Sequence, residues 1–339
     1  MHQRVVPILV ALSHIYFVLL LGGTLLGLVL GDRWWWLFFF HTFLLYLILV
    51  PLPFAILAAI ITRQRLLWVG NILVVGVAVA CYGLLLIPST TVIPESAAPL
   101  TAMSFNMLGS NENTDAVVQV LRNSDADLIG IQELSPAVAE AIADDLTDVY
   151  PYQVLDPQSG VTGMGVISRY PLAVSEAVLP GRWVGNPQVV SIDFADQLVT
   201  ILHVHATPTI GGSVANIEAS VRAREQQAQI LVDFAAANPG PSLILTDFNT
   251  GDQSAAYRIL TRTFRDVWRE GGWGLGHTFP SPPATSALPR VAGIGVPPWL
   301  IRIDYVFHST HWQTQSAWLG PWDGHSDHRP VMARLWIEE

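Results

Sequence analysis

Charged side chains are scarce in this chain of 339 residues. Asp, Glu, Lys and Arg together make up 13% of it, whereas a soluble globular protein contains about 25%. Three long segments, 5–31, 34–62 and 66–94, contain no charged residue. Each is longer than the roughly 20 apolar residues with which a helix crosses a bilayer. The chain is therefore not a purely soluble protein, and the lack of further segments of this kind after residue 94 excludes a transporter with many spans.

Lysine is absent, and cysteine occurs only once, as Cys81. A disulfide within the chain is impossible, so cysteine usage says nothing about the redox compartment. All 17 basic residues are arginine, and they are unevenly distributed. Residues 1–87 contain four Arg and one Asp, a net charge of +3, whereas residues 88–339 contain 13 Arg and 26 acidic residues, a net charge of −13. The two parts of the chain suit different surroundings.

The first part, residues 1–87, is expected to form a membrane anchor of three helices, at 7–30, 35–61 and 66–87. Helices are expected because backbone polar groups inside lipid must be satisfied within the segment. The tryptophans at 34–36 are typical of the aromatic belt at a membrane interface. A cleaved signal peptide is not expected, because the first segment is too long for a signal core and two more follow.

The orientation of the anchor follows from the basic residues in its short flanks. Arg4, Arg63 and Arg65 flank the first, second and third segments on one side, while Asp32 and Arg33 cancel on the other. Placing these three arginines in the cytoplasm puts everything after Leu86 on the extracytoplasmic side. Two histidines within the segments, at 14 and 41, have no acidic neighbour that suggests a site, so we expect neutral, packed side chains.

A linker and one large domain follow the anchor. Residues 88–99 contain three prolines, which prevent helix continuation and favour an extended chain. Residues 100–339 are enough for a single domain with a sizeable core. Short β-branched runs and periodic apolar positions predict strands alternating with helices. The expected strands are Thr101–Met107, Asp127–Gln132, Gly165–Ser168, Gln188–Phe194, Leu198–His205, Ser242–Thr246, Ile303–His308 and Met332–Trp336, and the helices are Thr114–Asn123, Ser135–Leu146, Val214–Ala237 and Ala255–Arg262.

The segment 271–300 has no regular period and is rich in glycine and proline. A loop of this length is usually functional or disordered. Its apolar residues, which include those at 294–299, could touch the bilayer or cover a site. A flexible insertion is an equally good interpretation.

Polar side chains recur at the ends of the expected strands. A carboxylate or amide there is a costly core residue unless it is paired, and strand ends that meet at one rim commonly assemble a site. These residues are Asn106, Glu133, His203, His205, Asp247, Asn249, Asp304, Asp327 and His328.

Each of these residues also has a purely structural interpretation. Asn106 could cap a turn, and Glu133 could simply precede a helix. Asp247 and Asn249 could form an Asx turn, and Asp304 could pair with the neighbouring arginine at 302. Their order and local sequence favour a common function.

Taken together, these motifs resemble those of the endonuclease/exonuclease/phosphatase superfamily, with its deoxyribonuclease I-like fold, in a membrane-anchored bacterial form. The resemblance covers residues 100–337 and implies an α/β (α+β) fold, a four-layer α-β-β-α sandwich of two packed sheets with the site at one rim. Thr246 departs mildly from the pattern, because the family commonly has glycine there. The motifs, in order, are Ser-Phe-Asn-Met, Ile-Gln-Glu-Leu, Gly-Met-Gly-Val-Ile-Ser-Arg-Tyr-Pro, His-Val-His-Ala-Thr-Pro, Thr-Asp-Phe-Asn-Thr, Arg-Ile-Asp-Tyr-Val-Phe and Ser-Asp-His-Arg-Pro-Val.

The resemblance also implies a role for each residue. Glu133, Asn106 and Asp327 would hold a hard cation, Mg²⁺ or Mn²⁺, which prefers oxygen ligands. Asp247 would orient or deprotonate the attacking water, and Asn249 would contact the phosphate. A second group acts on the phosphate or supports the centre: His205 would stabilise phosphate oxygens, Asp304 would support the centre or the metal, and His328 would face the scissile phosphate with its tautomer fixed by Asp327. His203 would be a packed or supporting residue.

The expected activity is metal-assisted, in-line attack of water on the phosphorus of a phosphoester, catalysed beside a membrane. The anchor favours a phospholipid headgroup, a lipid-linked phosphate or a periplasmic phosphodiester as substrate. An endonuclease or exonuclease acting on DNA or RNA is the alternative, although a net charge of −13 disfavours general nucleic-acid binding. A phospholigand-binding module without activity is a third interpretation, which the presence of Glu133, Asp247 and His328 disfavours.

Overall fold

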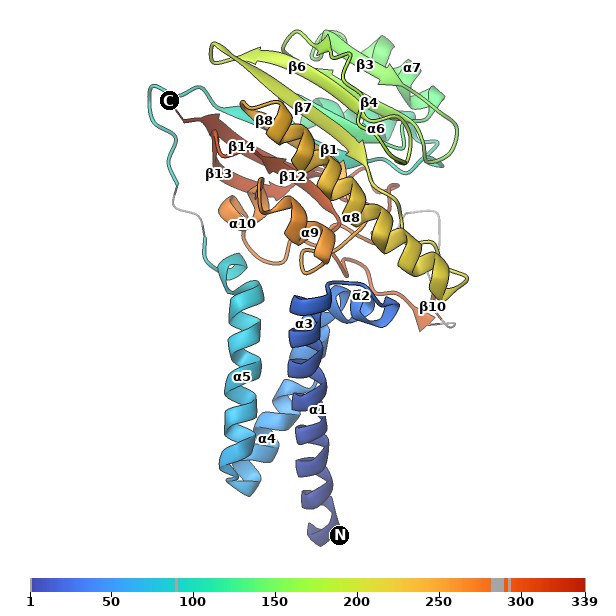
Figure 1. Ribbon diagram of the computed structural model, residues 1–339. Coiled ribbons are helices and arrows are strands. Elements are labelled where there is room, and N and C mark those ends of the chain that lie inside the picture. The colour runs from blue at the N-terminus through green and yellow to red at the C-terminus, as the bar shows by residue number, and fades with distance from the viewer. Residues whose placement is uncertain (1, 89–90, 282–289, 292–293, 339) are drawn as a thin grey trace.

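The computed structural model describes residues 2–88, 91–281, 290–291 and 294–338. A bundle of apolar helices stands below a larger domain (Figure 1). The bundle consists of α1 (His2–Leu30), α2 (Trp35–Thr42), α3 (Leu44–Leu49), α4 (Leu52–Thr62), α5 (Arg65–Tyr82) and a 3-10 turn at Gly83–Leu86. Three stretches of it are long and apolar enough to cross a membrane: Val6–Leu30, Leu44–Thr62 and Arg65–Leu86.

The second of these stretches differs from the sequence expectation of one helix at 35–61. The helix breaks at Phe43 and again before Pro51, and the first piece, α2, is a separate short helix. Leu37 and Phe38 of α2 are buried, and α2 lies across the top of the bundle, below the domain (Figure 1). Residues 35–42 are therefore held by packing on the domain, and the apolar stretch begins at Leu44.

The domain contains two six-stranded mixed sheets. The first has the order β13 (Trp312–Leu319), β14 (Val331–Ile337), β1 (Leu100–Asn106), β2 (Leu128–Gln132), β4 (Met164–Ser168) and β3 (Tyr152–Asp156). The second has the order β5 (Ala173–Val174), β6 (Gln188–Phe194), β7 (Gln197–His205), β8 (Ser242–Asp247), β12 (Asp304–His308) and β9 (Arg265–Asp266). A two-residue pair, β10 (Arg290–Val291) and β11 (Ile294–Gly295), forms a small separate hairpin.

The sheets pack face to face, with helices on their outer faces. Side chains alternate along β1, so that Ala102 joins the core between the sheets while Met103 and Phe105 join the core under the helices. The outer helices of the first sheet are α6 (Thr114–Asn123) and α7 (Pro136–Asp145), and those of the second are α8 (Val214–Ala237) and α9 (Ala255–Leu260). A short helix, α10 (Val267–Gly271), packs beside β12 and β13. The expected four-layer sandwich is confirmed.

The sheets come very close together at Gly130. A Cβ atom there would lie 2.7 Å from Cδ2 of His203 and 2.9 Å from Cβ of Leu245, on the facing sheet. His203 is fully buried at this contact; its Nε2 lies 2.8 Å from Nε2 of Gln132, and its Nδ1 lies 2.9 Å from Oε1 of Gln188. The imidazole therefore links the two sheets and does not line a surface.

The eight expected strands and four expected helices are present, each within two residues of its expected ends. The strands β3, β5, β9, β10, β11 and β13 were not expected. Residues 282–289 and 292–293 of the irregular segment, and the side chain of Ile294, lie outside the described residues. Contact of its tip with lipid therefore stays a prediction.

Candidate active site

Three neighbouring strands of the second sheet bring acidic and imidazole side chains together. β7 and β8 are parallel, with His205 opposite Asp247, and β12 is antiparallel to β8, with Asp304 opposite Asp247. On the first sheet, β1 ends at Asn106 and β2 ends one residue before Glu133. Because the sheets pack face to face, all these strand ends meet at one rim.

Asn106 connects the two sheets at this rim. Its Nδ2 donates to Oε1 of Glu133 and to Oδ2 of Asp247, both at 3.1 Å. The other carboxylate oxygen of Glu133 accepts from the backbone N–H of Gly109 at 2.8 Å. All three side chains are buried, so two carboxylates share one amide away from bulk water. Such an arrangement is costly unless positive charge is near.

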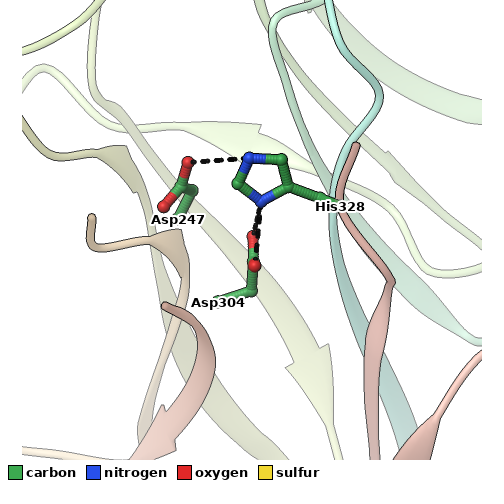
Figure 2. A group of neighbouring side chains, drawn as sticks. All are labelled: Asp247, Asp304 and His328. Carbon is green, nitrogen blue, oxygen red and sulfur yellow. Dashed lines mark hydrogen bonds and ion pairs between the residues drawn. The ribbon is translucent and has the colours of Figure 1, made fainter. Parts of the chain in front are cut away.

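His328 supplies positive charge between two carboxylates (Figure 2). Its Nδ1 lies 2.9 and 3.1 Å from the two carboxylate oxygens of Asp304, and its Nε2 lies 3.9 Å from Oδ2 of Asp247. This differs from the expectation that Asp327 fixes the tautomer. Oδ1 of Asp327 lies 3.9 Å from Nε2, and its side chain is 25% exposed. The adjacent acid in sequence cannot reach Nδ1 because that nitrogen faces the first residue of β12.

His205 and Asn249 complete the surroundings of Asp247. Nε2 of His205 lies 3.4 Å from Oδ2 of Asp247 and 3.2 Å from Nδ2 of Asn249. Asn249 also donates to the backbone carbonyl of Ala206 at 3.1 Å, and its own N–H donates to Oδ1 of Asp247 at 2.9 Å. The bond from the Asn249 N–H to Asp247 is that of an Asx turn, so the same two residues form the turn and belong to the site.

The charges in this cluster shift its pKa values. Burial alone raises the pKa of Asp247, but His328 and His205 outweigh burial and hold that pKa below its usual value. Burial lowers the pKa of His328, yet Asp304 and Asp247 raise it well above the usual value of an imidazole. For Asp304, burial raises the pKa and Asp247 adds to this, against the opposing charge of His328. The cluster thus contains an ionised Asp247 facing an imidazolium.

Two site residues have left-handed backbone conformations. Glu133 has φ 60° and Asn249 has φ 53°. Asn tolerates this region, but a side chain such as Glu adopts it rarely and at a cost of about 1–3 kcal/mol. Such a backbone conformation persists only where the surrounding structure holds it in place. At Glu133 it belongs to the turn that directs the carboxylate toward Asn106 and Gly109.

The irregular segment contributes residues that the sequence did not identify. The ring of Phe279 packs at 4.8 Å from the imidazole of His328. The hydroxyl of Thr278 accepts from the backbone N–H groups of Ile303 at 3.2 Å and Asp304 at 3.4 Å. The base of the segment therefore covers one side of the imidazole. Neither residue lies in a strand-end motif, so only the three-dimensional contact identifies it.

The loop that follows Asp247 rests on the helical bundle. Buried Asp32, in the turn after α1, contacts Nδ1 of His41 and accepts from the backbone N–H of Ala255 at 2.6 Å. Arg258 of α9 donates to the carbonyl of Gly27 at 3.2 Å. The expectation that His41 has no acidic partner is therefore wrong. His14, in contrast, contacts only the carbonyl of Val10 in its own helix among the hydrogen bonds of the described residues.

A divalent cation fits the donors at this rim. The carboxylates of Asp247 and Asp304 and the imidazole of His328 have ligand-type atoms within 4.8 Å of one another, and Asn106 joins Asp247 to Glu133. Because His328 is an imidazolium, the ligands at this rim are oxygen atoms. Carboxylate and amide oxygens suit a hard cation. Of the expected ligand set, the structure brings Asn106 and Glu133 together, while Asp327 lies 3.9 Å from Nε2 of His328, is partly exposed and forms no hydrogen bond with these two residues.

Residues 103–328 match the Endonuclease/Exonuclease/phosphatase family. They make up well over half of the chain, and the chain belongs to this family. Its members are generally phosphoester hydrolases and typically use divalent metal ions; the superfamily includes phosphodiesterases and nucleases. A search of the curated proteins finds no match.

Solved structures support the fold. A protein of this family from Beutenbergia cavernae is 19% identical, with 70% of this chain and 72% of that chain covered and a TM-score of 0.51. One from Bacteroides thetaiotaomicron is 15% identical, with 72% and 100% covered and a TM-score of 0.51. TDP2 from D. rerio, solved with a single-strand DNA product, is 16% identical, with 70% and 99% covered and a TM-score of 0.53. At these identities the likeness shows the fold alone.

Proposed function

We propose that this protein is a membrane-anchored, divalent-metal-dependent phosphoester hydrolase. The observation that supports this most directly is the buried Asp247 carboxylate, which lies 3.4 Å from one imidazole and 3.9 Å from another and is kept ionised by them. An ionised, buried carboxylate at a rim of donors is suited to orienting water. Neutral or cationic donors around it are suited to phosphoryl oxygens.

In the proposed reaction, Asp247 orients the attacking water and accepts its proton while the new P–O bond forms. The P–O bond to the leaving alcohol breaks in the same step, and the leaving oxygen takes a proton from solvent. The imidazolium of His328 donates from Nε2 to a phosphoryl oxygen as negative charge develops there, while Asp304 holds Nδ1. Nδ2 of Asn249 lies 3.2 Å from Nε2 of His205, and both side chains would contact the phosphate. Each group thus favours the transition state more than the ground state.

Asn106 and Glu133, with Asp247 beside them, would hold the cation, Mg²⁺ or Mn²⁺. When bound, the cation neutralises charge on the phosphoryl oxygens and so supports attack. Asp327, at the partly exposed side of His328, would contribute only through a water or the substrate. The family's use of divalent metals supports this assignment.

The anchor would place this site at the extracytoplasmic face of the cell's inner membrane. Arg63 follows α4 and Arg65 begins α5, so both lie at the turn between these helices, at the end of the bundle away from the domain (Figure 1). Basic flanks favour the cytoplasm, so the domain would lie outside. A phosphoester in a lipid headgroup or a lipid-linked phosphate is the substrate class that this position favours, because tethering concentrates enzyme and substrate in one layer.

The test is hydrolysis of bis-p-nitrophenyl phosphate by the full chain in detergent. Activity should require Mg²⁺ or Mn²⁺, disappear with a chelator, and fall at least a hundredfold in Asp247→Asn. The control is Asp144→Asn, an equivalent change at an exposed residue of α7. Retention of activity in Asp247→Asn would sink the mechanism, and a lack of activity in every protein would favour the phospholigand-binding module.

A nuclease is the second candidate, because the fold is similar to that of a protein solved with single-strand DNA. The net charge of −13 beyond residue 87 opposes it, since nonspecific affinity for nucleic acid comes from neutralised phosphates. Plasmid nicking and single-strand cleavage, measured beside a panel of phospholipids, separate the two. Cleavage of nucleic acid alone would replace the lipid proposal.

A further inference from the structure

A charged cavity lies between α8 and the turn that follows α1, and none of the strand-end residues lines it. Its volume is about 470 Å³, and its polar lining consists of Arg33, Glu218, Arg222 and Glu225, with Trp34 at one side. A second cavity of about 340 Å³ shares Trp34 and Glu218 and extends over the neighbouring tryptophans at 35 and 36. The N-terminal half of α8 descends toward α2 at the top of the bundle in this region (Figure 1).

The cavity lies at the height at which α1 leaves the apolar layer. The first apolar stretch ends at Leu30, which lines the cavity. The three tryptophans that follow are each 38–42% exposed, and rings of this kind sit at the level of lipid headgroups. A molecule entering the cavity from the side therefore comes from the headgroup layer.

The charges of the lining are only partly used within the protein. Arg222 and Glu218 form one loose contact, Nη1 to Oε2 at 3.8 Å, between partly exposed side chains. Glu225 and Arg33 form no hydrogen bond or ion pair with any residue that the structure describes. Glu225 is half-buried. Burial and the nearby Asp32 raise its pKa, and the charges of Arg258, Arg224 and Arg33 offset this only in part.

Two carboxylates and two guanidinium groups line this cavity. This lining suits a ligand that carries one positive and one negative charge. An ammonium group would be accepted by Glu225 and Glu218, and the stacked rings of Trp34 and Trp36, with centroids 5.8 Å apart, offer it an aromatic face. A phosphate would be accepted by Arg33 and Arg222. A purely anionic headgroup would leave both carboxylates uncompensated.

We propose that this cavity binds a zwitterionic phospholipid headgroup of the phosphoethanolamine type, as a lipid site separate from the strand-end rim. The bound lipid bridges α8 of the domain and the end of α1, and adds to the protein–protein contacts that hold the domain on the bundle. Binding requires no hydrolysis, so it does not depend on the function proposed above.

The test measures lipid binding to the full chain, delipidated in detergent, by native mass spectrometry. The probes are a phosphatidylethanolamine, a phosphatidylglycerol with the same acyl chains, and soluble phosphoethanolamine. The wild-type chain should bind the phosphatidylethanolamine at least tenfold more tightly than the other two. Equal binding of the two lipids overturns the proposal, and equally tight binding of soluble phosphoethanolamine overturns the lipid as its source.

The variant that removes both unused charges is Arg33→Gln with Glu225→Gln, and its matched control is Glu140→Gln with Arg334→Gln, two exposed residues of α7 and β14. The first should lose the tenfold preference, and the control should keep it. A second variant, Trp34→Leu, should weaken binding severalfold without altering charge. Preference retained in Arg33→Gln with Glu225→Gln overturns the proposal. Asp247→Asn should bind like the wild type whether or not the chain is a hydrolase.

Discussion

The contact between Asp304 and His328 leads to the most informative experiment. Asp304 is fully buried, and its carboxylate holds Nδ1 of His328 at 2.9 Å. In Asp304→Asn the shape of the side chain is kept, but its charge is lost. Because an amide N–H can then face Nδ1, the imidazole is free to adopt the other tautomer or to become neutral.

The size of the effect follows from what the substitution removes. A hydrogen bond to a charged group contributes about 1.5–3 kcal/mol, and the imidazolium also loses one of its two close carboxylates. We expect a loss of about 2–4 kcal/mol of transition-state stabilisation, which corresponds to a decrease in kcat of about 30- to 1,000-fold. Asp247, 3.9 Å from Nε2, prevents a larger loss by keeping one opposite charge in place.

The pH profile distinguishes this mechanism from a general loss of structure. Asp304 raises the pKa of His328, so the imidazolium persists to higher pH in the wild type than in the variant. The alkaline limb of kcat should therefore shift to lower pH in Asp304→Asn. Asp327→Asn is the comparison variant. Asp327 also raises the pKa of His328, but as the weakest of the contributing carboxylates and without contact to Nδ1, so the alkaline limb of Asp327→Asn should shift less than that of Asp304→Asn.

The assay is hydrolysis of bis-p-nitrophenyl phosphate at saturating Mg²⁺ or Mn²⁺, from pH 5 to pH 9. The reasoning is refuted if Asp304→Asn keeps the wild-type alkaline limb. It is also refuted if Asp327→Asn shifts that limb while Asp304→Asn does not, because Asp327 would then be the acid that holds the imidazole.

Three further predictions concern stability and docking. Burial lowers the pKa of His203 to about 3. Because this folded pKa lies below the unfolded value, the free energy of unfolding should decrease as pH falls below about 6.5, by about 1.4 kcal/mol per pH unit. Between pH 7 and pH 5 the Tm of His203→Gln should therefore fall less than that of the wild type. Gly130→Ala should destabilise by about 1–3 kcal/mol, seen as a lower Tm, because its Cβ would lie 2.7 Å from the His203 ring; an unchanged Tm would mean that the sheets separate easily. Asp32→Ala removes the acceptor of the Ala255 N–H and should weaken the docking of the domain on the bundle. After proteolysis within residues 88–99, the domain should separate from the bundle in this variant and remain bound in the wild type. Size-exclusion chromatography in detergent distinguishes the two outcomes.

The strands that carry the site were predictable from sequence because they are buried. β1, β2 and β8 are nearly continuous runs of buried residues, and polar side chains at their ends contrast with such runs. β13 was missed because buried and half-buried positions are mixed along Trp-Gln-Thr-Gln-Ser-Ala-Trp-Leu, without strict alternation. β3 is an edge strand whose residues are partly exposed, so its apolar signal is weak.

The sequence predicted which residues form the site better than it predicted which of them contact each other. Asp327 precedes His328 in sequence, but Asp304, the first residue of β12, is its Nδ1 partner. Sequence separation carries no information about this choice. The pairing of Asp32 with His41 depends likewise on the break in the second apolar segment, which turns α2 back over the end of α1.

The docking of the domain on α1 and α2 also determines how the site can meet its substrate. A linker of 12 residues, 88–99, could span about 40 Å when extended, which would allow a free domain to search a wide shell of solvent. The hydrogen bonds that α9 donates to Asp32 and Gly27 instead hold α9, and with it the loop between Asp247 and α9, at one height above the apolar helices. In the membrane-anchored hydrolase proposed above, encounter would then be a search in two dimensions, in which the lateral diffusion of molecules at that height replaces the reach of the linker.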